Sequence, residues 1–107
     1  MIEEQILAMQ RALAGIGGRL AVVAIPSHSQ RDPAAAQRDR EYTFFPQRRL
    51  AAICARANLP FLDLVPTLGA VTPTAELFKD DLHLTQRGHE VAAEAIHDFL
   101  SRERLID

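Results

Sequence analysis

The sequence is short of the residues that build disulfide or metal-held frameworks. Its 107 residues include one cysteine, Cys54, and no tryptophan. A single thiol can form neither an internal disulfide nor a cysteine-based zinc site. Cys54 falls at helical spacing with Leu50, Ile53 and Ala57, which predicts a small buried apolar side chain rather than a nucleophile. The length corresponds to one domain, 1–107, with a modest core.

The sequence also lacks an excess of charge and a long apolar run. The formal net charge is −2, which gives no electrostatic reason for binding to nucleic acid or to an anionic membrane. No segment is apolar over the length that spans a bilayer. The first residues, Met1 to Gln5, are acidic and unlike a signal peptide. We therefore expect a cytosolic location, unless a targeting sequence lies upstream of Met1.

What is present is an alternation of helical and strand patterns. Apolar residues at steps of three and four predict a helix over 2–16, and an unbroken apolar run predicts a buried strand over 20–25. Residues 27–43 are polar and predict a long loop. A second helix is expected over 46–57 and a second buried strand over 61–65, ended by Pro66. Residues 67–84 are expected to be irregular before a final helix that Thr85 caps.

The order helix, strand, helix, strand, helix predicts an α/β fold with a parallel sheet and right-handed crossovers. Two parallel strands do not form a stable sheet alone. At least one further strand is therefore expected, either from another copy of the chain or from sequence upstream of Met1.

The segment from Phe78 to His89 carries the most informative side chains. It follows the second predicted strand, and open α/β sheets bind ligands beyond the carboxyl ends of their strands. Asp80 precedes His83 by three residues. A histidine can take a proton from a hydroxyl near neutral pH, and a carboxylate can hold the correct imidazole tautomer. A short loop orders such a pair at little entropic cost.

The run Asp80-Asp81-Leu82-His83-Leu84-Thr85, followed by Gly88-His89, resembles the last block of the SGNH hydrolases, the GDSL-type esterases and lipases. The resemblance implies a three-layer αβα fold of which this chain supplies the C-terminal half. It also implies that Asp80 is the triad acid and His83 the base. Asp81 is the alternative acid, although the motif spacing favours Asp80.

The nucleophile block of that family is not found in the sequence. The family carries its serine in a Gly-Asp-Ser-like segment near the N-terminus, together with oxyanion donors. The three serines here are Ser27, Ser29 and Ser101. Ser27 and Ser29 follow the first predicted strand, yet they lack the strained turn that presents a nucleophile. We therefore expect the serine to lie outside this chain.

Other roles for these side chains remain open. Asp81, His83 and His89 are ligand types that suit a transition metal, but their spacing matches no metal motif, and no metal or cofactor is expected. His28, Arg31 and Tyr42 lie in the loop at the same predicted sheet edge as His83, and we expect them to contact substrate. Asp63 is expected to be a structural hydrogen-bond acceptor.

Two functions follow. In the first, the chain is part of an SGNH-type hydrolase acting on esters and is inactive or nearly so alone. In the second, it is a non-catalytic α/β module that associates through an exposed sheet edge.

Overall fold

The described elements follow the predicted alternation, with one helix more than expected. The computed structural model describes residues 2–27, 30, 44–71, 76–80 and 82–106. Its elements are α1 (Ile2–Ala14), β1 (Val22–Ala24), α4 (Phe45–Ala57), β2 (Phe61–Asp63), α5 (Val65–Gly69) and α6 (Gln86–Arg102).

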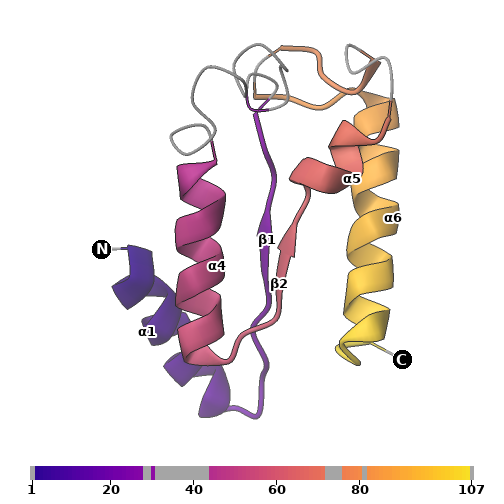
Figure 1. The fold of residues 1–107 in the computed structure, drawn as a ribbon. Helices are drawn as coiled ribbons and strands as arrows, with labels where there is room; N and C mark the ends of the chain where they lie inside the picture. The colour runs from indigo at the N-terminus through magenta and orange to yellow at the C-terminus, as the bar shows by residue number, and fades with distance from the viewer. Residues whose placement is uncertain (1, 28–29, 31–43, 72–75, 81, 107) are drawn as a thin grey trace.

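The two strands are parallel neighbours, with Val23 aligned with Leu62 and Ala24 with Asp63. In the described part of the chain the sheet consists of these two strands alone. Figure 1 shows the pair between α4 on one side and α6 on the other. Parallel pairing of strands that are joined through a helix is the βαβ arrangement, so the predicted α/β class is confirmed.

The larger part of the core lies between the sheet and α6. Its buried residues are Leu64, Leu68, Leu77, Phe78, Leu84 and Ala92, and Val23 and Leu62 pack against them. Because side chains alternate along a strand, the other face of the sheet is available to α4, which contacts both strands. Ile53 and Cys54 of α4 are buried, as predicted for Cys54.

The apolar face predicted for the first helix is largely exposed. Ile6 is buried, whereas Ile2, Met9 and Ile16 are exposed, Ile16 by 81%. Side chains at this spacing normally cover a core, and the described residues cover only the one at Ile6. Among those same residues, no helix combines the length and the apolar character needed to cross a membrane.

Helix α4 begins and ends where its sequence predicts. Pro46 occupies the first turn, where its missing N–H costs no hydrogen bond. Asn58 ends the helix in the left-handed conformation, with φ of 59°. Its backbone N–H donates to the carbonyl of Ala55. Asparagine tolerates this conformation better than most residues, which explains its place there.

The structure corrects the sequence analysis between β2 and α6. The strands are shorter than predicted, and α5 occupies residues that were expected to be irregular. Pro66 was interpreted as the end of a strand, but it lies in the first turn of α5. The Asp63 carboxylate accepts a hydrogen bond from the Val65 N–H at 2.9 Å. Asp63 is thus the structural acceptor that was expected, and it satisfies a donor at the start of the helix.

Candidate active site

The candidate site lies on a tight loop that is anchored in the core. Phe78 and Leu84 form an antiparallel bridge. The Lys79 N–H donates to the His83 carbonyl at 2.8 Å, and the Thr85 N–H donates to the Leu77 carbonyl at 2.9 Å. Phe78 and Leu84 are buried, so the bases of both arms of the loop are held by packing as well as by hydrogen bonds.

The first turn of α6 is joined to the base of the loop through Thr85. The Thr85 hydroxyl accepts a hydrogen bond from the Gly88 N–H at 3.1 Å and donates one to the Glu76 carbonyl. Thr85 is therefore the N-cap that the sequence predicts. Gly88 packs directly on the Leu77 backbone, where an added Cβ would lie 2.2 Å from the carbonyl oxygen. Only glycine allows this approach, which brings the helix against the anchored loop.

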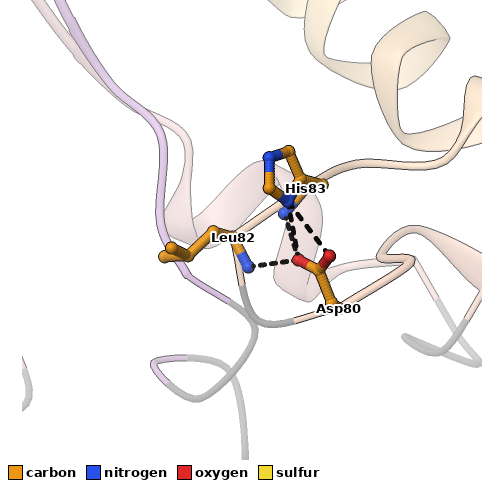
Figure 2. A network of polar contacts seen from close by, with 3 residues as sticks. All are labelled: Asp80, Leu82 and His83. Atoms are coloured by element: carbon orange, nitrogen blue, oxygen red, sulfur yellow. Dashed lines mark hydrogen bonds and ion pairs between the residues drawn. The ribbon is translucent and has the colours of Figure 1, made fainter.

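Asp80 organises the tip of the loop through three donors. Its Oδ1 accepts hydrogen bonds from the backbone N–H groups of Leu82 and His83, each at 2.9 Å. The same carboxylate contacts His83 Nδ1, at 2.9 Å through Oδ1 and 3.0 Å through Oδ2. Figure 2 shows the carboxylate facing the imidazole ring across the turn. Asp80 thus fixes the backbone of the turn and the histidine ring together.

These donors determine the protonation of the pair. The Leu82 backbone N–H and the His83 side chain lower the pKa of the Asp80 carboxyl below its ordinary value. The carboxylate is therefore ionised at neutral pH and can only accept hydrogen bonds. Nδ1 of His83 must then carry the proton of this hydrogen bond. In the neutral ring Nε2 is left with a free lone pair, which is the tautomer that a general base needs.

The Nε2 atom of His83 is open to an incoming group. The His83 side chain is 72% exposed and the Asp80 side chain 60%. Among the described residues, His83 Nε2 has no hydrogen-bond partner. Leu82, between them in the turn, is 76% exposed. The pair can therefore exchange a proton with a hydroxyl brought to it from outside the described residues.

The structure brings together two of the predicted site residues and leaves the others undescribed. His28, Arg31 and Tyr42, expected to contact substrate, and Asp81, the alternative acid, lie outside the described residues. Ser27 follows β1, where its backbone N–H donates to the Gln30 side chain at 3.0 Å.

Of the three candidate metal ligands, His83 and His89 are described, and Asp81 lies outside the described residues. The described residues contain no group of three metal-ligating side chains. His89, one of the three considered as ligands, is exposed in the first turn of α6. Burial raises the pKa of the Cys54 thiol, which disfavours the thiolate that a nucleophile requires.

A partly buried pair of glutamines, Gln30 and Gln47, was missed by the sequence analysis. Gln47 is 6% exposed. Its side-chain amide exchanges two hydrogen bonds of 3.0 Å with that of Gln30. The pair ties the first turns of α4 to the segment after β1. The available signal was the position of Gln47, which precedes Leu50 and Cys54 on the inward face of the helix.

An α/β chain that holds a carboxylate-oriented histidine beyond its second parallel strand is a hydrolase-like module. Residues 2–107 match the family described as ALGX, the SGNH hydrolase-like domain of the acetyltransferase AlgX. The chain belongs to this SGNH hydrolase-like family. Neither the curated proteins nor the solved structures include a significant match to the sequence.

Proposed function

We propose that this chain supplies the base and the acid of an SGNH-type active site that acts on esters. The observation that carries the proposal is the Asp80–His83 pair, in which Nδ1 is held at 2.9 Å and Nε2 is open. His83 is the general base and Asp80 orients it. The nucleophilic serine lies outside these 107 residues, in a segment that joins this one to complete the domain.

The reaction that fits these roles is acyl transfer through a covalent intermediate. The serine oxygen attacks the ester carbonyl while Nε2 of His83 takes the hydroxyl proton. The imidazolium, stabilised by Asp80, returns the proton to the departing alcohol as the C–O bond breaks. Water or a second hydroxyl group then attacks the acyl-enzyme and gives its proton to His83. The bond between the acyl carbon and the serine oxygen breaks, and His83 returns the proton to that oxygen. The acetyltransferase in the family description favours an acetyl group as the acyl group that is transferred.

The layering supports the same proposal. Figure 1 places α4 and α6 on opposite sides of β1 and β2, as the C-terminal half of a three-layer αβα domain requires. The loop with His83 and the segment that follows β1 lie at the same end of the molecule, where the two strands finish. On this arrangement His28, Arg31 and Tyr42 are proposed substrate contacts.

The high exposure of the pair also supports a missing partner segment. An oriented base works best where water is excluded, because the interaction with Asp80 is stronger in a low-dielectric site. The side chains of His83 and Asp80 are 72% and 60% exposed, so the described residues do not exclude water from them. The proposed serine-bearing segment provides it.

The alternative is a non-catalytic α/β module that associates through its sheet edge. It is favoured by the two-stranded sheet of the described residues, because an open strand edge presents unpaired backbone groups. This alternative does not account for the Asp80–His83 geometry, so we place it second.

The test begins with the gene upstream of Met1. An in-frame extension of about a hundred residues with a Gly-Asp-Ser-like segment is expected. The extended protein should hydrolyse an activated acetyl ester. The variants His83→Ala and Asp80→Asn should each lower kcat by about 10²–10⁴-fold. His97→Ala is the matched control, because His97 is also exposed and lies beside an aspartate, Asp98, at 3.7 Å.

Two results would overturn the proposal. A stop codon directly upstream would leave the pair without a nucleophile on the same protein. An extended protein whose activity survives His83→Ala would assign the chemistry to other residues.

A further inference from the structure

Opposite charges lie on α4 and α6, the helices on opposite sides of the two strands. On α4, Arg48, Arg49 and Arg56 are exposed and form the basic stripe. On α6, Glu90, Glu94 and Asp98 are exposed and form the acidic stripe. On α6 the acidic residues are four positions apart and lie along one side of the helix. On α4, Arg49 and Arg56 are seven positions apart and lie on one face, and Arg48 lies beside that face.

Each stripe holds charged side chains that form no ion pair within the described residues. Arg56 pairs with Glu3 at 2.7 Å, but Arg48 and Arg49 have no ion-pair partner there. The first turn of α4 holds no acidic residue, and the positive end of the helix dipole adds to the potential around Arg48. The Glu3 carboxylate, whose pKa is lowered by Arg56 and also by Arg49, is the one acidic partner of these three arginines among the described residues. The basic stripe therefore keeps an excess of positive charge.

The acidic stripe is its counterpart on the other side of the sheet. Glu90 is near Arg87, at 3.9 Å, and Asp98 is near His97, at 3.7 Å. Glu94 between them has no ion-pair partner among the described residues. The acidic stripe lies on the half of α6 that faces away from the core, since Ala92 and Phe99 are the buried side.

The two stripes match in length and direction. Arg48 to Arg56 and Glu90 to Asp98 each span eight residues, which is about 12 Å along a helix. Figure 1 shows α4 and α6 on opposite sides of the strands, both running from the end of the molecule where the strands finish toward the opposite end. A second copy placed beside the first in the same orientation therefore brings an acidic stripe against a basic one.

A shallow hollow gives the basic stripe a shape that can receive a helix. It is lined by Phe45, Arg48, Arg49, Ala52 and Arg56. Phe45 is 55% exposed, and Ala52 leaves a gap between the arginines. On α6, Ala93 next to the acidic stripe is also exposed. Its small side chain lets another helix approach the surface of α6 there.

We propose that the basic stripe of one copy of this chain binds the acidic stripe of the next. The contact is head to tail, because the two surfaces differ, and its geometry is open rather than closed. It uses the outer faces of the helices and leaves both edges of the sheet free. The proposal is therefore independent of the proposed catalytic function and compatible with it.

The test is sedimentation equilibrium of the purified chain at low and high salt. At about 10 mM salt the average mass should rise with protein concentration, and at about 0.5 M it should return to that of the monomer. The variants Arg48→Glu/Arg49→Glu and Glu94→Lys/Asp98→Lys should each be monomeric. An equimolar mixture of the first variant with the wild-type protein should associate less than the wild type alone. Each variant copy can bind through its acidic stripe but offers no basic stripe to the next copy, so the assembly stops there.

The matched control for the α4 variant is Arg11→Glu/Arg104→Glu, which makes the same change of charge at exposed positions outside the stripes. It should associate within about twofold of the wild type, whereas each stripe variant should lose about tenfold or more in affinity. Circular dichroism checks that every variant is folded. If the variant on α4 is unfolded, the variant on α6 tests the proposal by itself.

Three outcomes would overturn the proposal. The first is a wild-type chain that stays monomeric at low salt at about 1 mM, the weak limit of specific affinity. The second is association that persists at high salt, which would indicate pairing of sheet edges instead. The third is a control variant that loses as much affinity as the stripe variants, which would indicate a dependence on net charge alone.

Discussion

Gly88 touches the backbone of Leu77. A Cβ built on Gly88 would lie 2.2 Å from the Leu77 carbonyl oxygen, and that same oxygen accepts the hydrogen bond from Thr85. The contact joins the first turn of α6 to the base of the loop that carries Asp80 and His83. A residue with no side chain thus determines how closely the helix approaches the candidate site.

The first prediction concerns this contact. Gly88→Ala should lower the free energy of unfolding by about 1–3 kcal/mol, because the added methyl group clashes with the backbone of Leu77. The sign is informative, since glycine to alanine inside a helix ordinarily stabilises by about 0.5–1 kcal/mol. Urea denaturation measures the change. Gly69→Ala, where nothing lies within 4 Å, is the control and should be neutral or stabilising.

The second prediction concerns the cap of α6. Thr85→Ala removes the acceptor for the Gly88 N–H and the donor to the Glu76 carbonyl. The loss should be about 0.5–2 kcal/mol of stability, which is typical of an N-cap. Thr85→Ser keeps the hydroxyl and should recover most of that stability. Equal losses in both variants would mean that the methyl group of Thr85, rather than its hydroxyl, stabilises the turn.

The third prediction concerns the tautomer of His83. Nitrogen-15 NMR of the wild-type chain should show the neutral ring protonated at Nδ1. In Asp80→Asn, the amide oxygen should stay with the N–H groups of Leu82 and His83, which leaves the NH₂ group facing Nδ1. Because Nδ1 must then accept a hydrogen bond, the proton should move to Nε2. An unchanged tautomer would show that Asp80 does not control the ring.

His97 is the internal reference in the same spectrum. It is exposed and lies 3.7 Å from Asp98, which is beyond hydrogen-bond distance. Its tautomer should not respond to Asp80→Asn.

The fourth prediction is the response of the loop to acid. The pKa of Asp80 is lowered in the folded chain, chiefly by the Leu82 N–H. The stabilisation of the folded loop by ionised Asp80 is therefore fully present above the unfolded pKa of about 3.9. It is lost as the pH falls through the lower pKa of the folded chain. The amide signals of Leu82 and His83 should shift together below about pH 4. A midpoint above that of an unfolded aspartate would contradict the hydrogen bonds described for Asp80.

The sequence predicts the parts of the fold that depend on local rules. Thr85 caps α6 because its hydroxyl reaches an N–H three residues on, and Asn58 ends α4 because it tolerates a positive φ. Both effects involve neighbouring residues, so both are visible in the sequence. The Asp80–His83 contact is local in the same way, since three residues separate the two side chains.

The rest depends on contacts between distant segments. Pro66 is compatible with the end of a strand and with the start of a helix, and the Asp63 carboxylate beside it favours the helix. The exposure of Ile16 shows that an apolar face does not reveal what covers it. The pairing of Gln30 with Gln47 joins segments seventeen residues apart, and no periodicity predicts it.

The loop from Leu77 to Thr85 has a consequence for how an active site would be assembled. Asp80 and His83, the proposed acid and base, are three residues apart in a turn held by its own backbone hydrogen bonds. The chain therefore meets the entropic cost of orienting the imidazole by itself. A serine-bearing segment that arrived later would meet a base already in its productive conformation. The apparent affinity of that segment for this chain would then not be reduced by the need to select a rare conformer of the His83 loop.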